Sequence, residues 1–181
     1  MNDLTLIQEI LSHKPNSFEK LVHQYQKLVW KLIYQMVQNH DDTLELSQEV
    51  FMLVYRKLGQ YRAESSLATW IGRISYNCAV RFLQKKEHRI LCVNDDSLFE
   101  EAVENNAENE ILQSSITQQL EIALQRLPLL QRTIVNLYYL EELTVLEISE
   151  ICSIPQGTVK SHLYRARKSL QISLASKQDL L

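Results

Sequence analysis

The sequence predicts an all-α protein, built as two small helical domains joined by a flexible acidic linker. Outside the linker, apolar residues recur at spacings of three and four, which is the period of an amphipathic helix. Glycine and proline number only three each in 181 residues, so there are few turns of the kind that connect strands. The 45% of hydrophobic residues is enough for two modest cores in domains of roughly 70–90 residues.

The N-terminal part contains two strongly periodic segments. The first runs from Phe18 to Met36, and Asn16 or Ser17 can cap its start. The second runs from Asp41 to Leu58, with acidic residues in its first turn, where the helix dipole favours them. The polar face of this second segment carries Glu45, Gln48 and Glu49. Taken alone, such a cluster is most often a solvated surface.

Residues 65–89 are predicted to open with a small polar loop and to continue as a third helix. Its cations outnumber a single acid, Glu87, and aromatic side chains stand among them, namely Trp70, Tyr76 and Phe82. This mixture suits single-stranded nucleic acid, because aromatic faces stack with bases while cations follow the phosphates. The simpler interpretation is that Trp70, Ile74 and Phe82 are core residues, and we expect Trp70 and Ile74 to be mainly structural.

Residues 91–112 divide the chain by composition. They hold seven acidic residues and no Lys or Arg, with too little apolar surface to fold alone. The predicted domains are therefore residues 1–90 and 113–181, and residues 91–112 form the acidic linker. Both domains are slightly basic, so the overall net charge of −3 comes from the linker and is compatible with nucleic-acid binding.

The most informative segment runs from Leu143 to Leu170. Thr144 and Glu147 form a capping-box pattern, which predicts that a helix starts near Thr144. Cys152 to Ile154 gives a tight turn, and Pro155 stands in the first turn of a second helix, where its missing N–H is tolerated. Two short helices joined in this way indicate a helix-turn-helix, whose second helix enters the DNA major groove.

The second of these helices has one apolar face and one basic face. Helical spacing places Val159, Leu163, Ala166 and Leu170 on the packing side. The other side can contact phosphates and guanine edges through Gly157, Lys160, Ser161, Tyr164, Arg165 and Lys168. A solvated basic helix that closes a helical bundle is the alternative, but the capping box, the proline turn and the helix phase together favour DNA binding.

These segments resemble bacterial sigma factors of the extracytoplasmic-function group, in the sigma-70 family. The C-terminal domain of that family is similar to the string EISEICSIPQGTVKSHLYRARKSL, and the run before it is similar to LQRLPLLQRTIVNLYYLEEL. Two N-terminal motifs of the family resemble LELSQEVFMLVYRKLGQY and SSLATWIGRISYNCAVRFLQKKEHR. The resemblance spans roughly Phe18 to Leu170, apart from the linker.

The resemblance implies a factor that binds core RNA polymerase and directs initiation at particular promoters. Contacts to the clamp coiled coil of the polymerase would come from Glu45, Gln48 and Glu49. The −10 element would be melted and read as a single strand by Ser65, Ser66, Trp70, Arg73, Tyr76, Asn77 and Arg81, with the loop 63–67 holding a flipped base. The −35 element would be bound by Thr158, Lys160, Ser161, His162, Tyr164, Arg165 and Lys168.

The partners that the resemblance implies are core RNA polymerase, through its clamp coiled coil and flap, promoter DNA and, as is common in the family, an anti-sigma factor. Four positions depart from the family pattern. Arg81 stands where Asp is frequent, Gln84 and His162 stand where Arg is usual, and Glu45 replaces Asp. His162 is expected to make one −35 contact weaker or dependent on pH.

Catalysis, cofactors, metal ions and a small-molecule substrate are not expected. The sequence has neither a glycine-rich phosphate loop nor an H-E-x-x-H pattern, and its five histidines are not spaced as ligands. Cys78, Cys92 and Cys152 lack C-x-x-C spacing. No apolar run reaches the roughly 20 residues of a membrane span, and the start does not resemble a signal peptide, so we expect a cytoplasmic protein without membrane insertion.

Two other functions stay open at this stage. The first is a stand-alone helix-turn-helix regulator that dimerises on duplex operators, with residues 1–90 as a sensing or dimerising domain. The second is an adaptor that binds polymerase without directing initiation. The motifs over residues 44–89 favour a sigma factor, because a protein that binds only duplex DNA has no need of a strand-melting surface.

Overall fold

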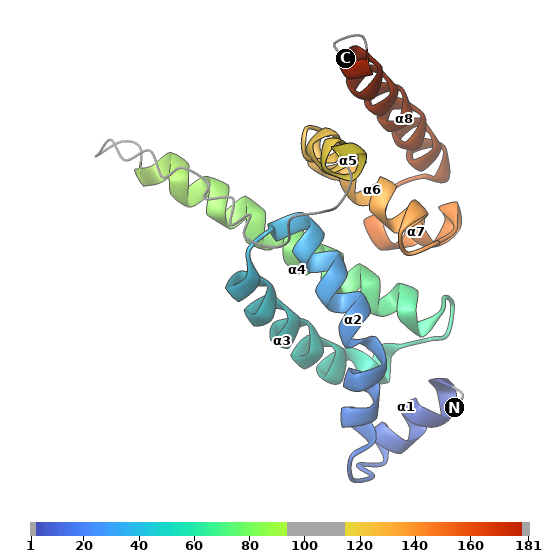
Figure 1. Cartoon of the computed structure of the whole chain (residues 1–181). Coiled ribbons are helices and arrows are strands. Elements are labelled where there is room, and N and C mark those ends of the chain that lie inside the picture. Colours follow the sequence, from blue (N-terminus) through green and yellow to red (C-terminus); the bar gives the residue numbers. More distant parts are fainter. Residues whose placement is uncertain (1–2, 94–114, 179–181) are drawn as a thin grey trace.

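The computed structural model describes residues 3–93 and 115–178. Over these residues the regular elements are all helical, which confirms the all-α class (Figure 1). In chain order they are α1 (Asp3–Leu11), α2 (Ser17–Val37), α3 (His40–Lys57), the 3-10 helix η1 (Leu58–Gln60), α4 (Leu67–Val93), α5 (Ser115–Gln125), α6 (Leu129–Tyr139), α7 (Val145–Cys152) and α8 (Gln156–Gln178). The predicted linker lies outside the described residues, except for its first three positions, which continue α4.

Helix α2 is the central element of the N-terminal part and packs on both α3 and α4. Its inward side chains follow the predicted period, since Leu21, Val29 and Ile33 are fully buried. They share one core with apolar residues of α1, α3 and α4. Helix α1 closes this core at the lower end of the molecule in Figure 1.

The start of α2 differs from the prediction. Asn16 is the N-cap residue, but it adopts a left-handed conformation with φ 62° and its side chain makes no capping bond. The hydroxyl of Ser17 donates instead to the carbonyl of Lys14 at 2.7 Å. The prediction of a side-chain cap from either residue was wrong, because Asn16 lacks the extended backbone of a capping residue and the Ser17 hydroxyl bonds to Lys14 instead.

The predicted helix-turn-helix is formed by α7 and α8. Thr144 Oγ1 accepts a hydrogen bond from Glu147 N at 3.2 Å, and Thr144 N donates to Glu147 Oε2 at 2.9 Å, which confirms the capping box. Ser153 ends α7 in a left-handed conformation with φ 55°. Helix α8 starts at Gln156, so Pro155 directly precedes the helix instead of standing in its first turn. The Pro155 carbonyl accepts hydrogen bonds from the amides of Thr158 and Val159.

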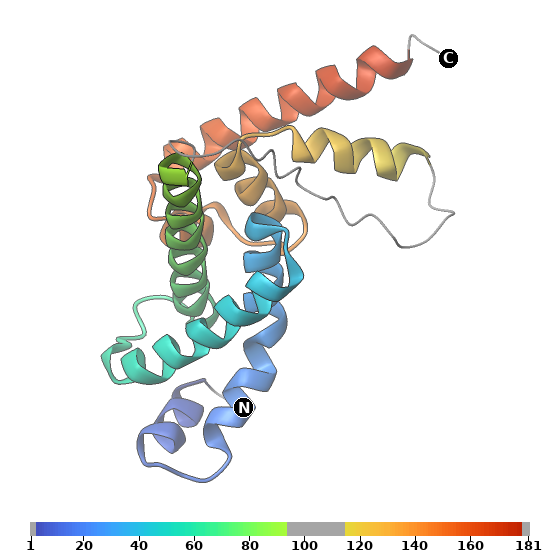
Figure 2. The same ribbon diagram turned by 90° about the vertical axis from the view of Figure 1, so that its left-hand side faces the viewer.

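The N-terminal and C-terminal parts pack directly on each other. Helix α4 lies against α7, and α2 contacts α6. Leu32 and Met36 of α2 and Ala79 of α4 belong to the same buried cluster as the apolar residues of the helix-turn-helix. Figure 2 shows α4 and α2 side by side, with α8 crossing above them.

Candidate nucleic-acid interface

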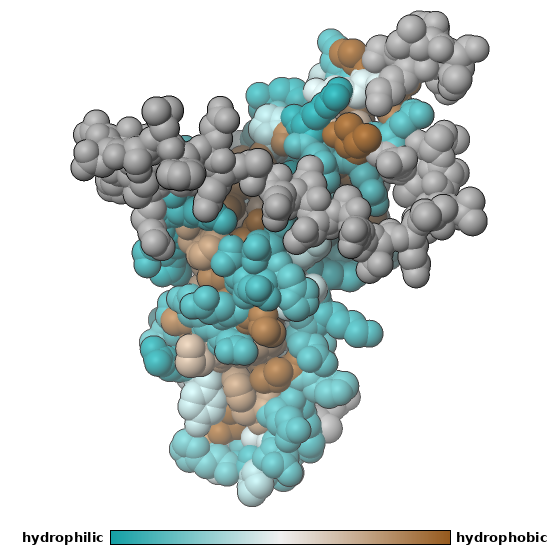
Figure 3. All heavy atoms as spheres, turned by 60° about the vertical axis from the view of Figure 1, so that its left-hand side comes forward, coloured by the Kyte–Doolittle hydropathy of each residue, from teal (hydrophilic) through white to brown (hydrophobic). Residues whose placement is uncertain are grey.

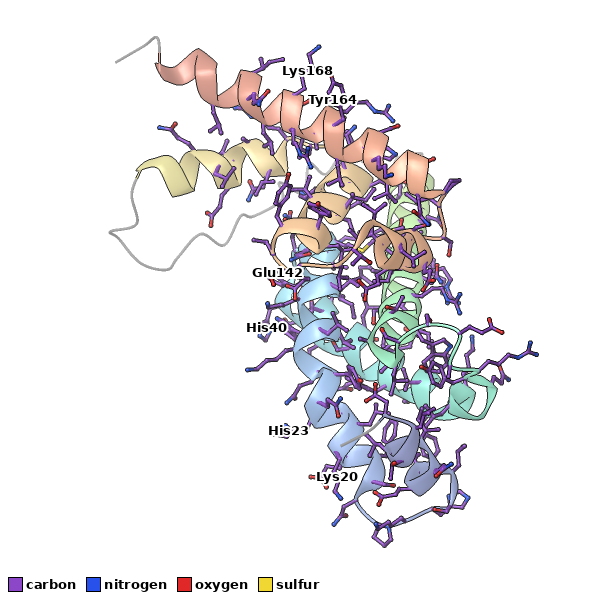
Figure 4. All side chains as sticks on the ribbon, turned by 90° about the vertical axis from the view of Figure 1, so that its right-hand side faces the viewer. Lys20, His23, His40, Glu142, Tyr164 and Lys168 are labelled. Carbon is purple, nitrogen blue, oxygen red and sulfur yellow. The ribbon has the colours of Figure 1, made fainter. Side chains whose placement is uncertain are left out.

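The outer face of α8 is basic and open to solvent. Lys160, Ser161, Tyr164 and Arg165 line a shallow surface hollow of about 520 Å³, and Tyr164 is 67% exposed. The Arg165 guanidinium is steadied by its Nε, which donates to the Ser161 carbonyl at 3.3 Å. Figure 4 shows Tyr164 and Lys168 on the side of α8 that points away from the rest of the molecule.

The inner face of α8 holds this basic face in position. Val159, Leu163 and Ala166 are buried against α6 and α7, so the predicted phase of the helix is confirmed. Arg167 does not join the outer face. Its Nε donates to the Tyr139 hydroxyl at 2.6 Å, and its guanidinium lies 5.7 Å from the centre of the Tyr139 ring. These contacts tie α8 to α6.

Two predicted −35 residues, Thr158 and His162, are only half exposed. The Nδ1 atom of His162 is buried and has no hydrogen-bond partner among the described residues. Burial lowers the pKa of His162 below its ordinary value of 6.5, and the nearby charge of Arg165 lowers this pKa further. The imidazole is therefore uncharged at neutral pH, unlike the arginine usual at this position.

Helix α4 presents a separate polar row to solvent. Arg73, Asn77 and Arg81 are exposed and follow one another at intervals of four residues, so they lie on one face. Arg81 Nε donates to the Asn77 carbonyl at 3.2 Å. The row holds two cations and an amide within three helical turns, which suits a phosphate backbone.

The loop before α4 is ordered by hydrogen bonds from its own residues. Ser66 Oγ accepts from the amide of Thr69 at 3.1 Å, which explains why the helix starts at Leu67. The Tyr61 hydroxyl donates to the Ser65 carbonyl at 2.6 Å. Ala63 has φ 56°, so the loop contains a left-handed turn that sequence reasoning did not identify.

Trp70 and Tyr76 do not lie on the exposed row. Trp70 is 9% exposed and packs edge-to-face on Tyr61, with ring centres 5.5 Å apart. Tyr76 is half-buried beside the helix-turn-helix, and burial, together with the nearby Cys152, raises its pKa to about 12. The structure therefore places both rings in packed surroundings, as expected for Trp70.

Helix α3 exposes the three polar residues predicted to meet polymerase, Glu45, Gln48 and Glu49. The same face also bears large apolar side chains that sequence reasoning missed, namely Leu44 at 48% exposure, Met52 at 54% and Tyr55 at 49%. Met52 and Tyr55 follow Leu44 by eight and eleven residues, which places all three on one side of α3, away from its buried positions. This spacing could have revealed the exposed apolar side chains from the sequence. Figure 3, which brings the α3 side of Figure 1 forward, shows apolar surface among polar side chains.

Neither a membrane span nor a metal site is found within residues 3–93 and 115–178. No helix there is both long enough and apolar enough to cross a bilayer. Likewise, these ranges contain no cluster of three or more His, Cys, Asp or Glu side chains that could hold a metal ion.

Over the described residues, a helical fold with a helix-turn-helix, an exposed basic face on its second helix and a further helix with exposed cations is typical of DNA-binding proteins of transcription. Two family models match: "Sigma-70 region 2" over residues 21–89 and "Sigma-70, region 4" over residues 117–170. The chain is 30% identical to the extracytoplasmic-function sigma-E factor of Haemophilus influenzae, with 94% of each chain covered. It is 24% identical to SigW of Bacillus subtilis, with 93% of this chain and 94% of SigW covered.

Solved structures have the same fold. The sigma factor RpoE of Bartonella quintana, in complex with the anti-sigma factor NepR, gives a TM-score of 0.71 at 21% identity, covering 88% of this chain and 98% of RpoE. CnrH, in complex with the cytosolic domain of CnrY, gives 0.67 at 14% identity, covering 95% and 96%. The chain belongs to the extracytoplasmic-function group of the sigma-70 family. It is an alternative sigma factor that directs promoter-specific transcription by RNA polymerase.

Proposed function

We propose that this sigma factor binds the −35 element through the outer face of α8. The observation that carries the proposal is the exposed set Lys160, Ser161, Tyr164 and Arg165, which lines one continuous hollow. No Asp or Glu occurs in α8, so nothing on that helix repels phosphate. Lys168 extends the face by one turn, whereas Thr158 and His162 stand at its edge and contribute less.

We propose that the −10 element follows the row Arg73, Asn77 and Arg81 as a single strand. Opening the duplex costs about 1.4 kcal/mol of stacking per base-pair step, and cations along the strand path offset part of that cost. The loop with Ser65 and Ser66 would receive a flipped base. Trp70 acts as a positioning residue, because its ring packs on Tyr61, whose hydroxyl holds the Ser65 carbonyl.

The third proposed contact is between α3 and core polymerase. Glu45, Gln48 and Glu49 supply charge and hydrogen bonds, while the neighbouring Leu44, Met52 and Tyr55 supply apolar contact area. A mixed face of this kind fits a partner helix, where apolar anchors contribute most of the affinity and polar groups set orientation. The clamp coiled coil of the polymerase is the partner that we propose for this face.

We further propose that residues 1–90 and 113–181 act as the two functional domains, connected by residues 91–112. An anti-sigma partner is proposed because RpoE of Bartonella quintana and CnrH were each solved with a protein partner, NepR and the cytosolic domain of CnrY. The proposal places the protein in the cytoplasm beside polymerase and assigns it no catalytic chemistry of its own.

Reconstitution tests the proposed contacts and finds the promoters. Core RNA polymerase is mixed with the purified chain and a genomic library, and new start sites are mapped by run-off transcription. The proposal expects the new transcripts to share a −35 element and a −10 element, and to begin at a fixed distance after the −10 element. A chain that fails to co-purify with core polymerase yet binds a duplex operator as a dimer would instead be the stand-alone regulator.

A further inference from the structure

Helix α1 lies outside the faces proposed to bind DNA and polymerase, and it also precedes residues 21–89, which match region 2. Figure 2 shows it beside the first turns of α2, at the lower end of the molecule. Its side chains Leu6, Ile7 and Ile10 are buried in the N-terminal core, which also contains Leu58 of η1. Since η1 leads into the loop before α4, α1 packs against the segment that carries this loop.

Both ends of α1 are held in place. The Tyr25 hydroxyl of α2 donates to Asp3 Oδ1 at 3.0 Å, and the Gln24 amide donates to the same oxygen at 3.3 Å. At the other end, Leu11 Cδ2 lies 3.8 Å from the place that a Cβ would take at Gly59 of η1. A helix of nine residues is too short to be stable by itself, so these contacts determine where α1 lies.

Tyr61 connects η1 to the loop that follows it. Its backbone amide donates to the Leu58 carbonyl at 3.1 Å, and its hydroxyl donates to the Ser65 carbonyl at 2.6 Å. Its ring packs on Trp70, with ring centres 5.5 Å apart. Because the hydroxyl reaches across the loop, the position of the Tyr61 side chain sets the position of the Ser65 carbonyl.

The Asp3 carboxylate lies near the Tyr61 hydroxyl as well as bonding to Tyr25. Burial raises the pKa of Tyr61, and the nearby charge of Asp3 raises this pKa further. Burial also raises the pKa of Tyr25, and the hydrogen bond to Asp3 adds to that effect. Both phenols therefore stay protonated at neutral pH, and each keeps a hydrogen to donate, Tyr25 to Asp3 and Tyr61 to Ser65.

The loop itself is strained and needs such support. Ala63 has φ 56°, a left-handed conformation that disfavours residues with a Cβ atom. A backbone of this kind persists only where the surrounding structure fixes it. Ser66 bonds to the amide of Thr69 on the α4 side, while the bond from Tyr61 to Ser65 spans the loop from the η1 side. Releasing the η1 side would let the loop relax.

We propose that Asp3 is a positioning residue for promoter opening, which fixes α1 against η1 and so keeps Tyr61 bonded to the Ser65 carbonyl. The inference rests on the proposed function, in which this loop receives a flipped base. A receptor that is already formed avoids the entropy cost of ordering the loop when the base arrives. Asp3 contacts no DNA in this role, and it acts on the loop through Tyr25 and Tyr61.

Base discrimination tests this role, because a ratio of two affinities does not depend on the fraction of folded protein. Holoenzyme made with core polymerase is titrated with a labelled single strand of a −10 element found by reconstitution. The same strand with an abasic site at each position in turn identifies the position where wild type loses most affinity. At that position Asp3→Ala and Tyr25→Phe should lower the ratio of the two affinities at least fivefold.

Matched controls remove the same chemical groups at exposed positions. Glu19→Ala removes an acid from the first turn of α2, and Tyr34→Phe removes an exposed hydroxyl from the same helix. Both should keep the wild-type ratio. Asp3→Asn keeps an oxygen that can accept from Tyr25, so its ratio should stay within twofold of wild type. A loss by Asp3→Asn as large as that by Asp3→Ala would overturn the hydrogen bond as the link.

An unchanged ratio for both Asp3→Ala and Tyr25→Phe, with native helix content by circular dichroism, overturns the positioning role. In a Tyr61→Phe background, Asp3→Ala should lower the ratio no further, and a second fivefold drop would overturn Tyr61 as the route to the loop. Failure of the proposed function leaves a different mark. Wild type itself would then bind equally well with an abasic site at every position, and the positioning role would fall with it.

Discussion

The amine of Lys31 on α2 and the carboxylate of Glu141 after α6 lie 3.0 Å apart and join the two parts of the chain. The Lys31 side chain is 54% exposed, but that of Glu141 is only 16% exposed. An ion pair with one shielded partner is screened less by salt than a pair at the open surface. The Lys31–Glu141 ion pair thus adds a polar contact between the two parts of the chain, beside the apolar contact of α4 with α7.

The first prediction concerns the Lys31–Glu141 ion pair. In a double-mutant cycle with Lys31→Ala and Glu141→Ala, we expect a coupling of about 0.5–1 kcal/mol in the free energy of unfolding, measured by urea denaturation. The coupling should shrink in 1 M salt. Additive effects of the two substitutions would show that the N-terminal and C-terminal parts are not held together by this pair in solution.

A second prediction separates the two arginines of α8. Arg165→Ala should weaken binding to a −35 duplex about tenfold, or about 1.4 kcal/mol, because the exposed guanidinium is lost from the basic face. Arg167→Ala is the matched control, since the Nε of Arg167 donates to the Tyr139 hydroxyl of α6. Fluorescence anisotropy with a labelled duplex measures both. If Arg165→Ala and Arg167→Ala lost the same affinity for the duplex, the outer face of α8 would not be the specific DNA-binding face.

A third prediction addresses the α3 face. Gln48→Ala with Glu49→Ala should lower affinity for core polymerase roughly tenfold and leave the melting temperature within a few degrees of wild type, because both side chains are exposed. Glu19→Ala with Gln26→Ala removes the same two residue types from the exposed face of α2 and serves as control. Surface plasmon resonance on immobilised core enzyme compares them. If the control pair loses as much affinity, the face has been misassigned.

The fourth prediction is a pH dependence due to His162. Its pKa is lowered in the folded chain, so folding releases a proton and opposes protonation of the ring. Stability should therefore be complete above the ordinary pKa of 6.5 and should fall as the pH drops through the lowered value. His162→Gln should flatten this part of the profile of unfolding free energy against pH. An unchanged slope between pH 7 and pH 5 would exclude His162 as the source.

Several elements could be predicted from local sequence because their causes are local. The capping box at Thr144 needs only Glu147 three residues away, and the phase of α8 follows from Val159, Leu163 and Ala166 within one helix. The exposed polar residues of α3 follow in the same way from its buried ones. The site residues were predicted from the sequence motifs, because these motifs identified the family on which the site assignments depend.

The missed features have causes that lie far away in the chain. The apolar residues of α4 extend over two of its sides, so its period cannot tell which side meets the N-terminal core and which meets another element. Tyr76 looked like a free aromatic among cations, but α7 covers it. The exposure of Leu44, Met52 and Tyr55 beside Glu45 and Gln48 has a local cause, since all five lie on α3, but only the structure shows that these three apolar side chains stay exposed.

By itself, the sequence determined the helical class, the helix-turn-helix, the basic face of α8 and the family, because repeat spacing and short motifs are encoded within about 25 residues. Only the tertiary structure decided that the helix-turn-helix docks on α4 at Gly72. That contact depends on how two surfaces about 80 residues apart in the chain fit together. Shape complementarity between distant helices arises from packing, and no local pattern of residues specifies it.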